Sequence, residues 1–308
     1  MMSMPPPALP MMDGLLRDQS LARYTAARLG GPADYLYIAR QPEYDDVIAL
    51  LEEAWRRDMP VTVIGGGANV LVADAGIRGL TIINRATDIQ HQRAGASARL
   101  QASSGTNLIR LARYCQENAL TGMEWAIAVP GTLGGAAVNN AGAHGSDIAS
   151  ALTRLLIYEA DGGRRWRDAA TLQYAYRYST LKHRRDRRFF VLRAELELQC
   201  DDSTRIQQRM DHNNEYRRRT QPPGASLGSI FKNPPGDYAG RLIEAAGLKG
   251  KRLGAVQVSP LHANFFVNQR VDASASDYRA LIQFVRQEVQ DRFGVALELE
   301  IQLLGAWQ

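Results

Sequence analysis

Two segments of this sequence are rich enough in glycine to bring bare backbone close to a ligand. The first, 65–69, reads Gly-Gly-Gly-Ala-Asn and follows the β-branched run Val61–Ile64. Successive backbone N–H groups without side chains can form a concave anion site, to which the amide of Asn69 could add a donor. A plain tight turn would need the same residues, so this segment alone leaves both interpretations open.

The spacing of this segment does not fit a dinucleotide-binding Rossmann fold. It lacks the third glycine of G-x-G-x-x-G, and residues 70–73 resemble a strand rather than the start of a helix. Without a helix N-terminus, that fold has no place for a pyrophosphate. We therefore do not expect a Rossmann domain.

The second segment, 130–145, is made almost entirely of small residues. Such residues bury little area, so packing alone does little to order them. Contact between the backbone and a large flat ligand would supply the missing stabilisation. A flexible linker is the alternative interpretation, but the apolar residues scattered from Val129 to Ile148 argue against it.

A third motif, 224–228, matches the G-x-S-x-G signature of serine hydrolases, and Asp237 and His262 follow in hydrolase order. That signature needs a strand before the serine and a helix after it. Two prolines precede the motif and a second proline pair follows it closely. We therefore expect a loop on both sides of Ser226 and no hydrolase.

The hydrophobic periodicity predicts the elements that must position these segments. The expected helices are Glu43–Arg57, Asn107–Asn118, Arg205–Arg219, Tyr238–Ala246 and Ser274–Phe293. The expected strands are Tyr35–Ala39, Val61–Ile64, Val70–Ala73, Gly79–Asn84, Leu100–Ser103, Leu155–Glu159, Phe189–Leu198 and Ala296–Leu303. Gly247 follows the fourth helix as a C-cap signal.

Length and composition favour a globular protein of two or three lobes. The chain has 308 residues, 45% of them hydrophobic, with no apolar run long enough for a membrane helix. Met1–Gly14 has no basic region before an apolar core, so we interpret it as a loose tail. Two cysteines, Cys115 and Cys200, suit a reducing cytoplasm, and five scattered histidines predict no metal site.

The net charge of +5 does not indicate a nucleic-acid partner. The densest basic cluster, His183–Arg188, is short and contains an acid. It is typical of a solvated loop, and a role near phosphates is the alternative. A mild basic excess also favours a small anionic ligand through electrostatic steering.

Residues 130–145 closely resemble the flavin loop of the UDP-N-acetylenolpyruvoylglucosamine reductase (MurB) family, which reads roughly PGxxGGAxxxNAGAxG. The resemblance continues, in order, over nearly the whole chain. Further matching motifs lie at 23–33, 64–72, 176–179, 228–234, 246–250, 257–259, 262–265 and 297–300. Each motif alone is modest, but their ordered occurrence is specific.

The resemblance implies an α+β fold of three domains, with a two-domain FAD-binding module of the vanillyl-alcohol oxidase (PCMH) type and a C-terminal α+β substrate domain. It places the first FAD subdomain at 1–84, completed by a closing strand within 294–308. The second FAD subdomain would be 85–204 and the substrate domain 205–293. The length resembles the shorter, type II branch of the family.

The family reaction implies non-covalent FAD as cofactor and NADPH as co-substrate. Hydride passes from NADPH through FAD to UDP-N-acetylglucosamine enolpyruvate, which gives UDP-N-acetylmuramate for peptidoglycan precursors in the cytoplasm. The partner would be this UDP-sugar, with no nucleic acid and no membrane. Another FAD-dependent oxidoreductase of the same fold and a non-catalytic sugar-nucleotide-binding protein remain alternatives.

By resemblance, the catalytic residues are Arg177, Ser229 and Glu300. Hydride transfer leaves charge beside the substrate carboxylate, which a guanidinium can stabilise. Glu300 can donate a proton only in its protonated form, which burial or a neighbouring carboxylate would favour. Ser229 would deliver the final proton to carbon through a relay. Alternation places Glu298 on the same face as Glu300, so the pattern cannot choose between them.

The resemblance also implies two sets of binding residues. The cofactor set is Gly65, Gly66, Gly67, Ala68, Asn69, Pro130, Gly131, Thr132, Gly134, Gly135, Asn140 and Gly142. The substrate set is Tyr176, Lys232, Asn233, Gln257, His262 and Asn264. We predict that the backbone at Gly134 and Gly135 lies against the flavin or its phosphates, because so small a run has little other reason to be ordered. Ala68 and Gln302 depart from the Ser and Arg that are common in the family.

Overall fold

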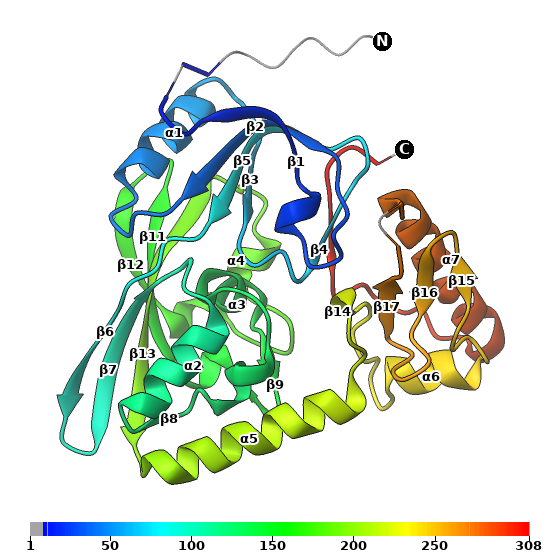
Figure 1. Ribbon diagram of the computed structural model, residues 1–308. Helices are drawn as coiled ribbons and strands as arrows, with labels where there is room; N and C mark the ends of the chain where they lie inside the picture. Colours follow the sequence, from blue (N-terminus) through cyan, green and yellow to red (C-terminus); the bar gives the residue numbers. More distant parts are fainter. Residues whose placement is uncertain (1–8, 11, 271, 308) are drawn as a thin grey trace. The chain divides into compact units, whose positions relative to one another are not determined.

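The computed structural model describes residues 9–10, 12–270 and 272–307 (Figure 1). Of the tail expected at Met1–Gly14, residues 1–8 and 11 lie outside the described part. The chain forms two compact units, each assembled from separated stretches of sequence. Unit 1 comprises Met1–Leu16, Leu36–Gly66 and Gly79–Arg217, and unit 2 comprises Arg17–Tyr35, Gly67–Arg78 and Arg218–Gln308.

An antiparallel sheet in the order β12-β11-β13-β7-β6 is the centre of unit 1. Its strands are β6 (Ile89–Ala94), β7 (Ser97–Ser103), β11 (Leu152–Glu159), β12 (Gly163–Asp168) and β13 (Phe189–Cys200), and β8 (Leu120–Thr121) also pairs with β13. Helix α2 (Leu108–Glu117) buries Leu108, Leu111, Ala112 and Cys115 in the same core. Asn107 caps this helix by accepting hydrogen bonds from two backbone N–H groups, as expected of an N-cap asparagine.

A second sheet has the order β1-β2-β5-β3. Its strands are β1 (Leu16–Ser20), β2 (Pro32–Ala39), β3 (Val61–Ile64) and β5 (Ile77–Asn84). Strands β3 and β5 pair in parallel from Val61↔Leu80 to Ile64↔Ile83. Helix α1 (Asp45–Arg56) connects β2 to β3, close to the predicted Glu43–Arg57.

Short elements fill the rest of unit 1. They are the 3-10 helices η2 (Glu124–Ala128), η3 (Ile148–Ser150) and η4 (Ala169–Leu172), helices α3 (Leu133–Asn139) and α4 (Thr180–His183), and the hairpin β9 (Gly142–Ala143) with β10 (Ser146–Asp147). The polar helix predicted at Arg205–Arg219 is α5 (Ser203–Thr220). Helix α3 was not predicted, and it lies inside the glycine-rich segment 130–145.

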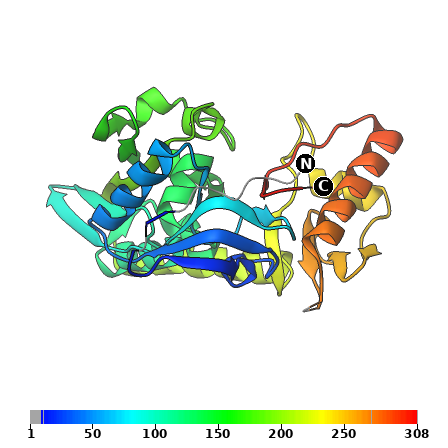
Figure 2. The same cartoon turned by 90° about the horizontal axis from the view of Figure 1, so that it is seen from above.

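Unit 2 contains a four-stranded antiparallel sheet that α7 (Ala275–Phe293) covers on one face (Figure 2). The strand order is β14 (Ala225–Ser229), β17 (Phe265–Asn268), β16 (Val256–Val258) and β15 (Arg252–Leu253). Helix α6 (Ala239–Ala245) completes this layer, and the 3-10 helix η1 (Ala22–Tyr24) also belongs to unit 2. A separate parallel pair joins β4 (Val70–Val72) to β18 (Gln302–Leu304).

Two predictions about strands are wrong. The closing strand was expected at Ala296–Leu303, but β18 begins only at Gln302, because residues 295–301 make a single isolated bridge, Phe231↔Leu299. Ser226 lies within β14 rather than between two loops. No helix follows directly, so the geometry of a hydrolase nucleophile is still missing. No helix within the described residues is both long and apolar enough to cross a membrane.

Candidate functional site

The two glycine-rich segments contact each other within unit 1. A Cβ added at Gly66 would lie 2.7 Å from Cα of Gly131, and one added at Gly65 would overlap the hydroxyl of Thr132. Gly65, Gly66 and Gly131 are all half-buried. The absence of side chains therefore lets the segments touch and leaves a surface made largely of backbone.

A neighbouring stretch, 104–108, fixes the second glycine segment through backbone hydrogen bonds. The N–H of Gly134 donates to the carbonyl of Ser104 at 2.7 Å, and the N–H of Leu133 donates to Thr106 at 2.9 Å. The N–H of Leu108 in turn donates to the carbonyl of Gly131 at 3.1 Å. Hydrogen bonds from the residues that follow strand β7 therefore order this glycine-rich segment. The amino-acid composition of the segment gave no indication of these bonds.

Gly134 and Gly135 differ in what surrounds them. A Cβ on Gly134 would lie 2.8 Å from Cβ of Ser104, whereas one on Gly135 would meet only the Thr132 hydroxyl at 3.5 Å. Internal packing against Ser104 therefore gives Gly134 a reason to be glycine besides a ligand, and its contact with a flavin stays a prediction. Gly135 is exposed, and contact with a flavin stays a prediction for it.

Asn140 and Arg177 tie the end of the glycine segment to a second loop. Asn140 is 2% exposed and has a left-handed backbone, and its amide donates to Asp147 and to the carbonyl of Ala175. The guanidinium of Arg177 donates to the carbonyls of Asn140 at 3.3 Å and Gly142 at 3.0 Å. The structure thus brings Arg177 onto the predicted flavin loop.

Arg177 lies at the tip of a tight turn. Ala175 and Tyr178 exchange two backbone hydrogen bonds, and Arg177 has φ +54°. The guanidinium lies 5.1 Å from the ring centroid of Tyr176, which is 55% exposed. Ser179, by contrast, is fully buried and donates to the carbonyl of Val138. The turn therefore presents Tyr176 to solvent while its base is anchored in the core.

His144 lies in the hairpin loop of the same segment. Its ring makes an edge contact with Tyr216 of α5 at 5.5 Å. Burial, with smaller contributions from the nearby charges of His212 and Arg217, lowers the pKa of His144. The imidazole is therefore held toward its neutral form.

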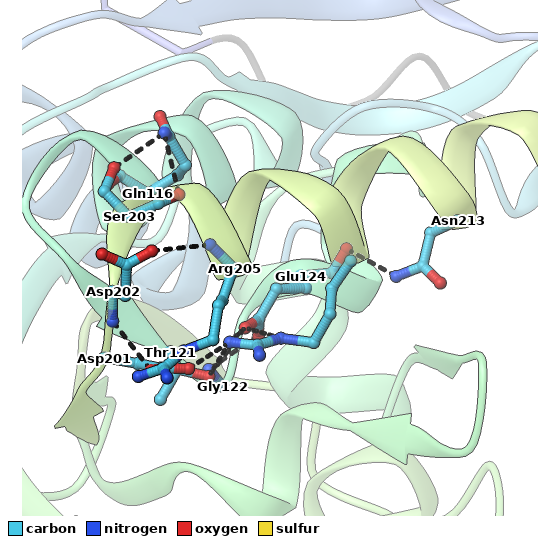
Figure 3. A network of polar contacts seen from close by, with 10 residues as sticks. Gln116, Thr121, Gly122, Glu124, Asp201, Asp202, Ser203, Arg205 and Asn213 are labelled. Carbon is cyan, nitrogen blue, oxygen red and sulfur yellow. Dashed lines mark hydrogen bonds and ion pairs between the residues drawn. The ribbon is translucent and has the colours of Figure 1, made fainter.

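A polar network attaches α5 to η2, immediately before the glycine segment (Figure 3). Glu124 accepts from Thr121, from the N–H of Gly122 and from Arg209, while its carbonyl accepts from the amide of Asn213 at 3.1 Å. Arg209 also pairs with Asp201. Burial alone would raise the pKa of Glu124, but these hydrogen bonds outweigh it and leave the pKa lowered. The sequence carried no signal for this network, because its members are far apart in the chain.

The basic stretch at 183–188 is partly neutralised. Arg184 pairs with the buried carboxylate of Glu159, and Arg188 pairs with Asp186. These pairs are typical of a structural loop.

In unit 2, Ser229 ends strand β14 at an irregularity in the pairing with β17. Gly228 before it has φ +74°, a conformation that favours glycine. Ser229 is half-buried, and no described residue is hydrogen-bonded to its hydroxyl. The hydroxyl is therefore available to a ligand.

Glu300 lies next to Ser229 through backbone pairing. Its N–H donates to the carbonyl of Ile230 at 2.8 Å, and its own carbonyl accepts from the amide of Asn69 at 3.2 Å. The side chain of Glu298 is 75% exposed and pairs with Lys232 at 3.1 Å. Of the two glutamates, Glu300 is the more buried, and it has the backbone bond beside Ser229.

The remaining predicted substrate residues of unit 2 are engaged with protein. Asn264 is 3% exposed, and its amide binds both the N–H and the carbonyl of Phe231. Asn233 accepts from the N–H of Ala239 at 3.2 Å, and Gln257 donates to the carbonyl of Gly250. His262 accepts at Nδ1 from the N–H of Asn264, and burial is the main cause that lowers its pKa.

The first glycine turn is divided between the units after Gly66. A Cβ on Gly67 would overlap the carbonyl of Tyr24, and the carbonyl of Gly67 accepts from the N–H of Ala26. Asn69 binds the Glu300 backbone rather than presenting its amide freely. Cofactor contacts at Gly67, Ala68 and Asn69 stay predictions.

The residues of unit 1 fit FAD. A flat ring system with a pyrophosphate needs a surface that backbone can approach closely, and Gly65, Gly66, Gly131 and Gly135 provide one. Pro130 is exposed beside them, and the buried Thr132 begins α3. These residues would hold the cofactor.

Comparisons with known proteins agree with this geometry. Residues 36–166 match the model of the FAD binding domain, and residues 220–304 match that of the UDP-N-acetylenolpyruvoylglucosamine reductase C-terminal domain. The chain is 39% identical to the UDP-N-acetylenolpyruvoylglucosamine reductase of Lactococcus lactis subsp. cremoris, with 94% of each chain covered. It is 43% identical to that of Anaeromyxobacter dehalogenans, covering 94% of this chain and 85% of the relative.

A solved structure supports the fold. The UDP-N-acetylenolpyruvylglucosamine reductase (MurB) of Thermus caldophilus superimposes with a TM-score of 0.76 at 31% identity, covering 94% of this chain and 98% of that one. The predicted α+β fold, an FAD-binding module with a C-terminal domain, is confirmed, while the three domain boundaries stay predictions. The chain therefore belongs to the UDP-N-acetylenolpyruvoylglucosamine reductase family.

Proposed function

We propose that this chain, an FAD-dependent oxidoreductase, reduces UDP-N-acetylglucosamine enolpyruvate to UDP-N-acetylmuramate with NADPH as the electron donor. FAD, when bound, would supply hydride for the terminal carbon of the enolpyruvyl group. The carbon beside the carboxylate then takes a proton, so one NADPH and one proton are consumed for each double bond reduced. The name of the relatives supports this substrate.

The observation that carries the proposal is the pairing of Glu300 with the residue after Ser229. The N–H of Glu300 binds the carbonyl of Ile230 at 2.8 Å, so a carboxyl group and a hydroxyl that no described residue binds lie on adjacent backbone. Ser229 delivers the proton to carbon, and the carboxyl group of Glu300 acts beside it on the enolate. Arg177 offers a fixed positive charge to the substrate carboxylate.

FAD is held without a covalent bond in this proposal. Covalent attachment would need a nucleophilic side chain in the flavin loop, and the candidate there is His144, whose ring packs against Tyr216. Acid precipitation should leave the yellow colour in the supernatant. Colour in the pellet would contradict the proposal on this point.

Anaerobic stopped-flow absorbance separates the two halves of the reaction. Reduction of the flavin by NADPH needs no serine proton, whereas reduction of the enolpyruvyl group does. Ser229→Ala should keep its FAD, be bleached by NADPH at a near wild-type rate, and be reoxidised by the enolpyruvyl substrate about 10²–10⁴-fold more slowly.

Ser226→Ala is the matched control, because Ser226 lies on the same strand three residues earlier. It should alter neither half. Equal loss of both halves in Ser229→Ala would mean that Ser229 supports structure, and a fast second half would assign the proton to another residue. A yellow protein that NADPH bleaches but the enolpyruvyl substrate never reoxidises would overturn the proposed substrate.

A further inference from the structure

A buried polar cluster adjoins the second glycine-rich segment, 130–145, of unit 1. Its members are Tyr44, the N-cap residue of α1, Asn84, which ends β5, and Ser104, which follows β7; they are 1%, 4% and 1% exposed. The three residues come from separate parts of the sequence, and this Tyr44 cluster joins them.

The hydroxyl of Tyr44 is the centre of the cluster. It lies 3.3 Å from the amide oxygen of Asn84 and 3.2 Å from the hydroxyl of Ser104, and it accepts from the N–H of Gly105 at 3.3 Å. Asn84 also donates to the Ser104 hydroxyl at 2.8 Å. Tyr44 has φ +62°, which is unfavourable for a bulky residue, so other contacts must maintain it there.

The cluster connects directly to the predicted flavin surface. Ser104 donates its hydroxyl proton to the carbonyl of Val191, and its own carbonyl accepts from the N–H of Gly134 at 2.7 Å. Residues 104–108 carry the further backbone bonds to Leu133 and Gly131. The position of the 131–134 backbone therefore depends on where Ser104 and Gly105 are held.

We propose that Tyr44 is a positioning residue for FAD, whose hydroxyl holds Ser104–Gly105 and so presets the backbone of Gly131–Gly135 for the cofactor. This inference rests on the binding of FAD by unit 1 in the proposed function. Tyr44 is 1% exposed, so in this proposal it acts only through the segments that it fixes. Preorganisation matters because affinity falls in proportion to the fraction of molecules in the binding conformation.

Tyr44→Phe removes the hydroxyl and keeps the ring contact with Phe190 at 5.2 Å. Without FAD, the 104–105 segment can shift until water satisfies Asn84 and the N–H of Gly105; with FAD bound, it cannot. We expect the dissociation constant of FAD, measured by quenching of flavin fluorescence, to rise about ten-fold. The visible spectrum of the bound flavin should also shift, because its protein contacts relax.

Tyr158→Phe is the matched control, because Tyr158 is a buried tyrosine of unit 1 whose hydroxyl binds Glu52. It should lower the melting temperature of the apoprotein and leave the dissociation constant and the flavin spectrum unchanged. Unchanged FAD binding in Tyr44→Phe, or equal weakening in both variants, would overturn the inference. Failure of the wild type to bind FAD in the same titration would instead overturn the proposed function.

Should Tyr44→Phe fail to fold, Ser104→Ala tests the same link. It keeps the backbone carbonyl that binds Gly134 and removes the hydroxyl that binds Tyr44, Asn84 and Val191. It should weaken FAD binding by a similar factor. Wild-type affinity in this variant would also overturn the inference.

Discussion

The glycine segment of unit 1 and the Ser229–Lys232 segment of unit 2 are both fixed by hydrogen bonds, but they expose different chemistry. Backbone bonds from 104–108 hold the first, and Gly135, one of its exposed positions, has no side chain. The side chain of Asn264 and the backbone of residues 298–300 hold the second. Its Ser229 is half-buried and has a hydroxyl to which no residue in the described part of the chain is hydrogen-bonded.

Bare backbone in unit 1 and a single supported side chain in unit 2 suit different kinds of ligand contact. A flat cofactor needs close approach and many weak contacts, so the absence of side chains is useful. A proton donor needs one group in one position, so a rigid support behind a single side chain is useful. Four substitutions can break or sharpen this comparison.

Asn264→Leu should have the largest effect. It leaves the N–H and the carbonyl of Phe231 unpaired in a buried place, so unfolding of unit 2 should become easier by about 3 kcal/mol. FAD content should stay normal. Urea denaturation and flavin absorbance measure the two properties. The control is Asn268→Leu at the end of β17, which breaks one bond to the carbonyl of Ala27 and one from the N–H of the exposed Arg270.

Gly134→Ala should come next. The new methyl would press against Ser104 at 2.8 Å, and backbone on both sides cannot move far, so stability should fall by about 2 kcal/mol. FAD binding should weaken with it, because the segment must shift. A variant as stable as the wild type would show that the backbone around residue 134 can shift at little cost. The glycine segment would then not be held rigidly by residues 104–108.

Gly135→Ala should raise the stability of the apoprotein instead of lowering it. The added methyl meets only the Thr132 hydroxyl at 3.5 Å, and alanine is the better helix former, so the apoprotein should gain about 0.5–1 kcal/mol. If the flavin lies on this backbone, its affinity should nevertheless fall. Thermal melts of the apoprotein and FAD titrations would then move in opposite directions, and unchanged affinity would place the cofactor elsewhere.

Glu124→Gln should have the smallest effect, below about 1 kcal/mol at neutral pH, since its partner Arg209 is 44% exposed. The folded pKa of Glu124 is lowered, so the carboxylate stabilises the fold above the ordinary pKa of glutamate. That contribution is lost as pH falls through the lowered folded pKa. The difference between wild type and variant in urea unfolding should therefore shrink in acid; a constant difference would contradict this.

Caps and periodicity made several helices predictable from the sequence. Periodicity placed a helix at Ser274–Phe293, and the structure adds that the N–H of Asp277 donates to the Ser274 hydroxyl at the start of α7. The helix expected at Asn107–Asn118 is α2, with Asn107 as its N-cap. These signals are local, because a cap and its helix lie within a few residues of each other.

Elements that depend on distant partners were missed. Helix α3 contains Gly134 and Gly135, which disfavour helix, and it forms where residues 104–108 supply bonds to its first turn. Strand β12, Gly163–Asp168, is an exposed edge without an apolar face to reveal it. The family motifs identified Ser229 and Glu300 as candidate site residues. They did not indicate that the amide of Asn264 binds the backbone of Phe231, because the sequence does not show the direction of a side chain.

The pairing of β4 with β18 also bears on how the protein is made. Val70–Val72 leaves the ribosome early, whereas Gln302–Leu304 is translated more than two hundred residues later, so this ladder closes a very long loop. Every stretch of unit 1 has been translated by Arg217. A nascent chain can therefore assemble the glycine segments while it still lacks Glu300. The backbone bond from the N–H of Glu300 to Ile230, the residue after Ser229, can likewise form only after residue 300 has been translated.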